Sequence, residues 1–382
     1  MKPSGLAPDD LPIREELLAV SAYGAPQLDV PVRLNTNENP HPPGDEVVAA
    51  IAAELLGEIG NLQRYPDRDA VALRAALAAY LTDTTGIGLA IENVWAANGS
   101  NEILAQLLAL FAGPGRSALG FEPTYSMHSI IARGANTHYR DVPRDADFAV
   151  DVEAASAAIA SQPPAITFVC SPNNPTGTAV GLDTISDLYD VIAAQPVGVL
   201  VVDEAYAEFS ENQSAITLLP GRPRLIVTRT MSKAFAFAGA RVGYLAADPS
   251  VVEAIGRVRL PYHLSSLTQA AARGALAHAR ELQSAVDDLK TQRDRIVTVA
   301  RGLGLPVADS DANFVLIGGF CDQAAVWQEL LEAGVLVRDV GLPGWLRVTA
   351  GTKAETDAFL SALTSVVQHF TRTMPAEPQQ ST

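Results

Sequence analysis

The chain has 382 residues, of which 48% are hydrophobic and 18% charged, and this composition predicts a large apolar core divided between two or three domains. Its 27 basic and 43 acidic residues give a net charge of −16, which disfavours nucleic acid and anionic membranes as partners. Two isolated cysteines, Cys170 and Cys321, indicate a reducing compartment. The sequence has neither a secretory signal nor an apolar run long enough to span a membrane, so we expect a cytoplasmic enzyme. No histidines or cysteines are spaced as the ligands of a metal ion usually are, so we expect no metal site.

The first forty residues are rich in proline and turn formers and predict an arm that packs on another part of the chain. The apolar stripe that starts at Val71 predicts a helix over 68–80. Short apolar runs then alternate with helical patterns, which is typical of a mainly parallel sheet with helices on both faces, a three-layer α/β fold. The runs cover residues 93–97, 117–121, 165–170, 197–202, 225–228 and 242–246.

The pattern changes near residue 265, where a long helical stretch runs to about residue 303. Two further strand candidates follow, at 313–317 and 345–349, with helices between and after them. We therefore predict a second, smaller α+β domain. The predicted organisation is an arm over residues 1–40 that packs with the small domain, a large domain over 41–265, the small domain over 266–373 and a flexible tail over 374–382.

Polar side chains follow the predicted strands, and ligands collect at the carboxyl ends of parallel strands. The set comprises helix-start amides, an aromatic ring, a side-chain amide, a carboxylate, a phenol and an amine. In chain order these residues are Ser100 and Asn101, Tyr125, Asn174, Asp203, Tyr206, and Thr230, Ser232 and Lys233. A ligand that fits this set carries a phosphate, a flat ring, a basic ring nitrogen and a carbonyl group. Pyridoxal 5′-phosphate (PLP) has all four.

In this hypothesis Lys233 forms a Schiff base with the aldehyde, and Asp203 keeps the ring nitrogen protonated, so that the ring withdraws electrons. Tyr206 and Asn174 hydrogen-bond the phenolate oxygen, and Tyr125 stacks on the ring. Lys233, Asp203 and Tyr206 are the predicted catalytic residues. The predicted phosphate ligands are Ser100, Asn101, Thr230, Ser232 and Arg241. Taken singly, each residue also has a structural interpretation, such as a helix cap for Asp203 or a turn former for Asn174.

Three motifs resemble the fold-type I aminotransferases, namely Ser-Pro-Asn-Asn-Pro-Thr-Gly at 171–177, Asp-Glu-Ala-Tyr at 203–206 and Thr-Met-Ser-Lys at 230–233, with Arg241 eight residues further on. The methionine departs from the commoner leucine or phenylalanine. Four more motifs resemble the histidinol-phosphate aminotransferase branch of that family, at 34–40, 64–67, 97–102 and 346–352. The resemblance extends from about residue 10 to about residue 368.

The resemblance implies a transfer of the amino group of L-histidinol phosphate to 2-oxoglutarate, which gives imidazole acetol phosphate and L-glutamate in histidine biosynthesis. It implies that Lys233 also moves the proton between the substrate carbon and the cofactor carbon. Arg347, Arg338 and Asn174 are expected to bind the substrate, the two arginines through its anionic end. Tyr65 is expected to reach the partner's cofactor phosphate across a homodimer interface.

Other functions stay open at this point. An aromatic amino acid aminotransferase shares the cofactor residues and differs only in its substrate pocket, and a PLP-dependent phosphothreonine decarboxylase has a similar fold. A PLP-sensing transcription regulator is disfavoured because only a short arm precedes the first motif. A nicotinamide dehydrogenase is disfavoured because no Gly-x-Gly-x-x-Gly follows a predicted strand. Asn37 and Glu38 receive no role, and His128 and His263 are interpreted as packing or hydrogen-bonding residues.

Overall fold

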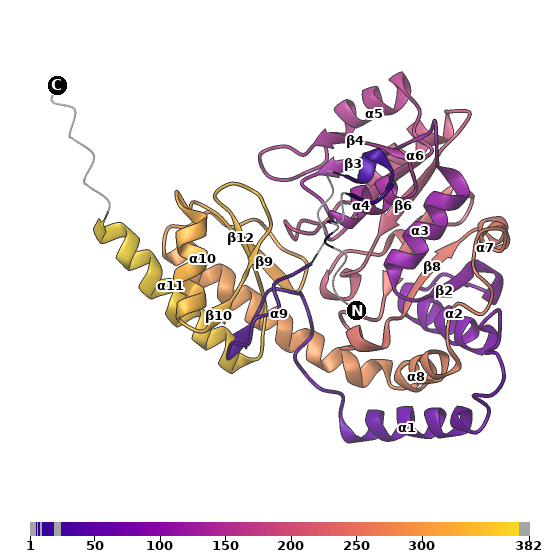
Figure 1. Cartoon of the computed structure of the whole chain (residues 1–382), viewed down its shortest axis with the longest axis horizontal. Coiled ribbons are helices and arrows are strands. Elements are labelled where there is room, and N and C mark those ends of the chain that lie inside the picture. Colours follow the sequence, from indigo (N-terminus) through magenta and orange to yellow (C-terminus); the bar gives the residue numbers. More distant parts are fainter. Residues whose placement is uncertain (1–4, 6, 8–9, 19–23, 374–382) are drawn as a thin grey trace.

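The computed structural model describes residues 5, 7, 10–18 and 24–373. A large body surrounds a seven-stranded sheet, and the C-terminal elements form a smaller body beside it (Figure 1). The predicted tail over 374–382 and part of the predicted arm lie outside the described residues. Within the described part of the chain, no helix combines the length and apolar character that a membrane crossing requires.

The large sheet has the strand order β2-β8-β7-β6-β5-β3-β4. Only β8 runs against the other six strands, so the sheet is mainly parallel, as predicted. In chain order the strands are β2 (Val94–Ala97), β3 (Ser117–Glu122), β4 (His138–Pro143), β5 (Ile166–Cys170), β6 (Val199–Asp203), β7 (Leu225–Thr230) and β8 (Gly243–Ala247). The sequence did not predict β4, because it is an edge strand in which only Val142 is buried.

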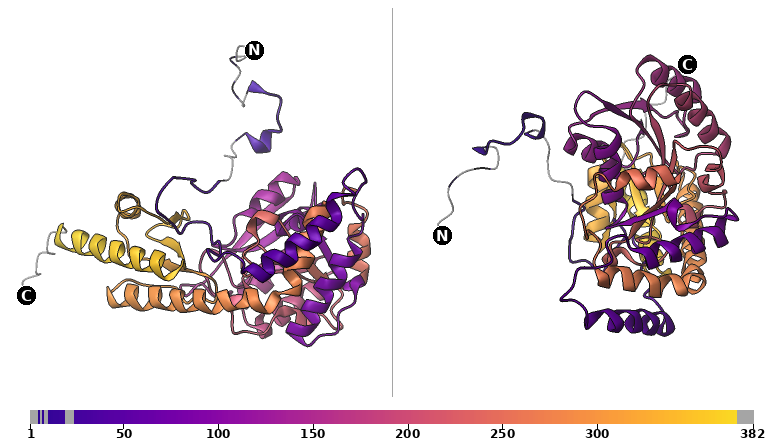
Figure 2. Two further views of the ribbon diagram at one scale, coloured as in Figure 1. Left: turned by 90° about the horizontal axis from the view of Figure 1, so that it is seen from below. Right: turned by 90° about the vertical axis from the view of Figure 1, so that its right-hand side faces the viewer.

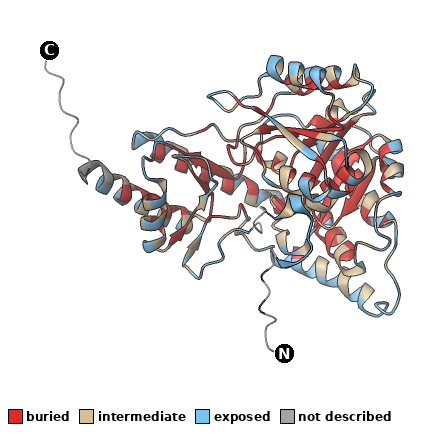
Figure 3. Ribbon diagram, turned by 45° about the horizontal axis from the view of Figure 1, so that its top comes forward, coloured by how far each residue is buried: buried red, intermediate tan, exposed pale blue. Residues whose placement is uncertain are grey.

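Helices cover both faces of this sheet, and its strands form the buried centre (Figure 3). In β6, Val199 and Val201 belong to one apolar cluster, whereas Leu200 and Val202 belong to the other. This alternation explains why the strand reads as an uninterrupted apolar run. The first cluster includes residues of α3 (Ser100–Phe111), α4 (Met127–Gly134) and α7 (Pro249–Ile255); the second includes residues of α2 (Val71–Thr85), α5 (Val152–Ser161), α6 (Leu182–Ala193) and α8 (Ser266–Ala277).

The predicted helix over 68–80 begins later and ends later in the structure, as α2. The Asp67 carboxylate accepts hydrogen bonds from the backbone N–H groups of Asp69 (3.0 Å) and Val71 (2.7 Å). Ala70 adopts a left-handed conformation with φ of 47°, so the helix starts after it. The helix ends at Gly86, whose φ of 73° suits glycine.

The smaller body contains the antiparallel strands β11 (Arg338–Asp339), β12 (Leu346–Thr349) and β9 (Phe314–Ile317), with α10 (Gln323–Glu332) and α11 (Lys353–Thr373). The predicted helical stretch over 265–303 is two helices, α8 and α9 (Ala279–Gly302), that are separated at His278. Short 3-10 turns occur at Glu15–Leu17, Ile91–Asn93, Ala207–Phe209, Ala215–Leu218 and Ala238–Ala240.

The described part of the arm contacts both bodies. Strand β1 (Val32–Arg33) pairs in parallel with β10 (Val335–Leu336) of the smaller body. Arg14 donates a hydrogen bond to the backbone oxygen of Gly134 at the end of α4 (2.9 Å). After the arm, α1 (Asp45–Ile59) packs on α8. The domain boundaries at residues 40, 265 and 373 stay a prediction.

Candidate active site

A cavity of about 140 Å³ lies at the carboxyl ends of β5, β6 and β7, next to the start of α3. Ten of the thirteen predicted site residues line it, although they come from six separate segments of the chain. These ten are Ser100, Asn101, Tyr125, Asn174, Asp203, Tyr206, Thr230, Ser232, Lys233 and Arg241. The strand-end rule therefore located the cavity correctly, while the chemical role of each residue stays a prediction.

The carboxylate of Asp203 is buried at the end of β6, with 1% of the residue exposed. His128 Nε2 lies 3.2 Å from Oδ2, and the Thr228 hydroxyl donates to Oδ1 at 3.2 Å. His128 is itself fixed by stacking on Phe168, with ring centroids 4.7 Å apart. Within the described part of the chain, no lysine or arginine pairs with Asp203. A cationic group of a ligand would therefore stabilise this buried charge.

The amine of Lys233 follows β7 and donates a hydrogen bond to the backbone oxygen of Thr36 (3.1 Å). Burial lowers the pKa of Lys233 to about 8, and the nearby positive charge of Arg347 acts in the same direction. An ordinary lysine is almost fully protonated at neutral pH. With a pKa of about 8, about a tenth of the Lys233 amine is neutral at pH 7, and the neutral amine is the form that acts as a nucleophile.

The start of α3 forms an anion-binding corner. Gly99 occupies the N-cap position with φ of 81°, and no side chain caps the helix there, so its first amides are open to a ligand. A Cβ atom on Gly99 would lie 2.7 Å from Nη2 of Arg241. Ser232 Oγ lies beside Arg241 Nη1 (3.5 Å) and accepts from the Thr230 hydroxyl (2.9 Å). Helix amides, hydroxyls and a guanidinium thus converge, as a phosphate site requires.

Two further predicted residues, Tyr206 and Asn174, are linked to the arm and to the smaller body, respectively. Tyr206 is buried, which raises its pKa, and its hydroxyl accepts a hydrogen bond from Asn37 Nδ2 (3.0 Å). Asn174 Oδ1 accepts from Arg347 Nη1 (2.5 Å). Arg347 therefore lies next to the cavity although it is not one of the lining residues. Its cross-strand partner on β11 is Arg338.

Arg338 and Tyr65 lie outside the cavity in this single chain. Nη1 of Arg338 donates to the backbone oxygen of Gly24 (3.3 Å). Tyr65 is 80% exposed and stacks on Tyr262, with ring centroids 4.5 Å apart and an interplanar angle of 14°. The structure of one chain thus places neither residue against the predicted cofactor site.

The sequence missed four residues with a polar side chain or a thiol that line the cavity or contact its centre. Thr36, Asn37 and Cys170 are lining residues, and His128, interpreted from sequence as a packing or hydrogen-bonding residue, contacts Asp203. Cys170 ends β5 and pairs in register with Asp203, so the strand-end rule could have found it. The other three carry no such signal, because they reach the site through long-range packing.

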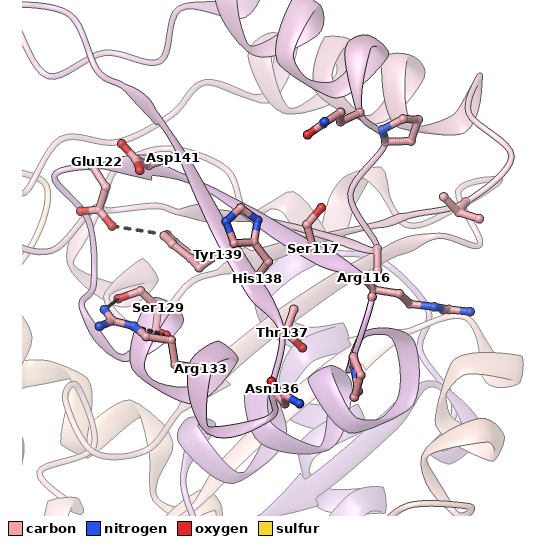
Figure 4. A pocket seen from close by; sticks show the side chains of 16 residues that line it. Arg116, Ser117, Glu122, Ser129, Arg133, Asn136, Thr137, His138, Tyr139 and Asp141 are labelled. Atoms are coloured by element: carbon pink, nitrogen blue, oxygen red, sulfur yellow. Dashed lines mark hydrogen bonds between the residues drawn. The ribbon is translucent and has the colours of Figure 1, made fainter. Parts of the chain in front are cut away.

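A larger open groove of about 1180 Å³ lies along edge strand β4 (Figure 4) and contains none of the thirteen predicted site residues. Two pairs of its polar side chains bond to each other. Tyr139 Oη donates to Glu122 Oε1 (3.4 Å), and Arg133 Nη2 donates to Ser129 Oγ (3.3 Å). The smaller cavity, which joins an amine, a buried carboxylate and an anion site, is the better candidate for catalysis.

A family model described as "Aminotransferase class I and II" matches residues 30–363. The match covers the sheet, the cavity and most of the smaller body. The chain therefore belongs to the class I and II aminotransferases, which confirms the family and the α/β fold predicted from sequence.

Curated relatives define the branch. The chain is 60% identical to the histidinol-phosphate aminotransferase of Frankia casuarinae over 357 residues, which are 93% of this chain and 90% of the relative. It is 56% identical to that of Mycolicibacterium vanbaalenii over 360 residues, which are 94% and 96% of the two chains. A crystal structure of histidinol-phosphate aminotransferase from Sinorhizobium meliloti in complex with pyridoxal-5′-phosphate matches with a TM-score of 0.80 at 26% identity, and covers 89% of this chain and 92% of that one. Among the aminotransferases, these relatives are histidinol-phosphate aminotransferases.

Proposed function

We propose that the chain is a PLP-dependent aminotransferase that converts L-histidinol phosphate and 2-oxoglutarate reversibly to imidazole acetol phosphate and L-glutamate, in histidine biosynthesis. The observation that carries this proposal is the cavity in which Lys233, Asp203 and Tyr206 meet beside the anion-binding corner of α3. The identity of 56–60% to histidinol-phosphate aminotransferases over most of the chain supports the substrate.

The cavity fits the cofactor at three points. The open amides at the start of α3, together with Arg241, would hold the phosphate. The buried carboxylate of Asp203 would hold a protonated ring nitrogen, and Lys233 would hold the aldehyde carbon. When bound, PLP supplies an electrophilic carbon and an electron-withdrawing ring that stabilises negative charge on the substrate carbon beside the amine.

Side chains of the protein carry out the proposed proton transfers and hydrogen bonds. Because the pKa of Lys233 is about 8, its amine both accepts and returns a proton near neutral pH. His128 and Thr228 contact the two carboxylate oxygens of Asp203 and hold them in place, so that the carboxylate would be positioned to bind the ring nitrogen. Tyr206 and Asn174 line the same cavity and would donate hydrogen bonds to the ring oxygen.

The substrate's anionic end is assigned to Arg347 and Arg338. They are direct partners on antiparallel strands, so two like charges lie on the same face of the small sheet. Like charges directly opposite each other in a sheet are unfavourable, and an anion bound between them would relieve that repulsion. A guanidinium pair suits a phosphate as well as a carboxylate, and therefore suits both the donor substrate and 2-oxoglutarate.

A homodimer is the proposed active unit. The outward stripe of α1, at Val48, Ala52, Leu56 and Ile59, is exposed and apolar, and Figure 2 shows this helix at the outer surface of the body. Tyr65, which follows α1 in the chain, and Tyr262 are also exposed and stack on each other, and Tyr65 is proposed to complete the partner's phosphate site. Sedimentation at micromolar concentration tests this, and a fully active monomer would contradict it.

The test of function is a panel of amino donors with the purified cofactor-loaded protein, scored by the glutamate formed from 2-oxoglutarate. We expect histidinol phosphate to give the highest kcat/KM and Lys233→Met to abolish the reaction. A higher kcat/KM for phenylalanine would indicate an aromatic aminotransferase. Release of carbon dioxide without consumption of the keto acid would indicate a decarboxylase. The proposed location is the cytoplasm, where the isolated Cys170 and Cys321 would stay reduced.

A further inference from the structure

Three consecutive arm residues, 35–37, contact three functional side chains that come from three different elements. The contacts are Arg347 Nη2 to the Asn35 oxygen (2.8 Å), Lys233 Nζ to the Thr36 oxygen (3.1 Å) and Asn37 Nδ2 to Tyr206 Oη (3.0 Å). The first two contacts use the backbone of the arm, so many sequences could make them. The third depends on one side chain, and that side chain is Asn37.

Asn37 is held rigidly in this position. It is buried, and its φ of 55° lies in the left-handed region, where asparagine is favoured over most residues. Its backbone N–H donates to the Thr349 hydroxyl (3.0 Å), which in turn donates to Asn37 Oδ1 (3.0 Å). Its backbone oxygen accepts from Asn313 Nδ2 (3.2 Å). Because Oδ1 is engaged by Thr349, the amide nitrogen faces Tyr206.

The direction of this hydrogen bond fixes the phenolic proton. An amide nitrogen only donates, so Tyr206 Oη is the acceptor and its own proton must point elsewhere. Among the described residues, no other partner of Oη is found, and Tyr206 lines the cavity. We propose that Asn37 is a positioning residue that turns the Tyr206 hydroxyl proton into the cavity, toward the ring oxygen of the bound cofactor. This inference rests on the proposed function.

The expected consequence is measurable without turnover. A proton donated by Tyr206 stabilises negative charge on the ring oxygen, and therefore lets the nitrogen of Lys233 in the loaded protein lose its proton at lower pH. Without Asn37 the Tyr206 proton is no longer directed, and the pH midpoint of the cofactor's visible absorbance should rise. One neutral hydrogen bond corresponds to a rise of about half a unit to one unit.

The experiment is a double-mutant cycle on the cofactor-loaded protein with Asn37→Gly, which suits the left-handed φ, and Tyr206→Phe. We expect Asn37→Gly to raise the midpoint when Tyr206 is present and to have no effect in the Tyr206→Phe background. Asn136→Gly is the matched control, because this asparagine also has a left-handed φ (52°) but lines the groove along β4 instead of the cavity, and it should leave the midpoint unchanged.

Equal shifts in both backgrounds, or no shift with Tyr206 present, would overturn the inference. If Asn37→Gly does not fold, Asn37→Asp can replace it, since aspartate has the same size and also tolerates a left-handed φ. The midpoint shift caused by Asn37→Asp must then be larger with Tyr206 present than in the Tyr206→Phe background. If wild type shows no visible absorbance that depends on Lys233, the proposed function fails, and this inference fails with it. If that absorbance is present and the cycle is additive, only the role of Asn37 is wrong.

Discussion

Replacing Lys233 by methionine should stabilise the cofactor-free protein at neutral pH, although it destroys the nucleophile. Burial lowers the pKa of this lysine from 10.5 to about 8. At about 1.4 kcal/mol for each pH unit, the buried charge lowers the free energy of unfolding by about 3 kcal/mol at most. The lost hydrogen bond to the Thr36 oxygen offsets about 1 kcal/mol of the gain. We therefore expect a net stabilisation of about 2 kcal/mol.

The stabilisation must depend on pH in a defined direction. The folded wild-type protein binds fewer protons than the unfolded chain between pH 8 and 10.5, so its stability rises with pH across that window. The advantage of Lys233→Met is therefore complete below pH 8 and lost above pH 10.5. Urea unfolding of both cofactor-free proteins at several pH values measures it. Lys353→Met, at an exposed lysine, is the control and should show no such trend. A difference that is constant with pH, or a destabilised variant at neutral pH, would refute the reasoning.

Three more substitutions test the site. Gly99→Ala should weaken cofactor binding about tenfold or more in an absorbance titration, because the added Cβ would lie 2.7 Å from Arg241 and a φ of 81° is strained for alanine. Gly86→Ala is the control: it is strained in the same way but its Cβ would enter open space, so the affinity should not change. Asp203→Asn keeps the shape, removes the charge and should lower kcat by about a hundredfold, so an unchanged kcat would argue against its role. Arg347→Lys loses the planar pair of donors and should raise KM about tenfold with a smaller change in kcat, whereas the reverse pattern would remove Arg347 from substrate binding.

The strands of the sheet could be predicted because each one leaves a pattern in a short stretch of sequence. Strands buried on both faces, such as β6, read as continuous apolar runs, and a polar residue directly after such a run lies at the ligand edge. That reasoning found Asp203 and Lys233 without any three-dimensional information. It failed for β4, whose exposed edge position removes the apolar signal, and for the break at His278 between α8 and α9.

The contacts of the arm could not be predicted, because they join residues far apart in the chain. Asn37 contacts Tyr206 and Thr349 because the arm pairs with β10 and passes next to the cavity. An asparagine in a turn-rich segment reads from sequence as a turn former. Its function as a hydrogen-bond donor depends on the three-dimensional position of its partners, which local patterns do not encode.

The same arm contacts Arg347, the residue proposed to bind the anionic end of the substrate. Arg347 donates to two uncharged oxygens, the side-chain oxygen of Asn174 and the backbone oxygen of Asn35. These bonds hold the guanidinium in a fixed orientation, yet a charged phosphate or carboxylate is a stronger acceptor than an amide oxygen. An anion bound to Arg347 as proposed would replace these weaker acceptors and would not compete with a carboxylate at these two donors. Since Asn174 also lines the cavity, its release by Arg347 would couple substrate binding to the hydrogen bond that Asn174 is proposed to make with the cofactor ring.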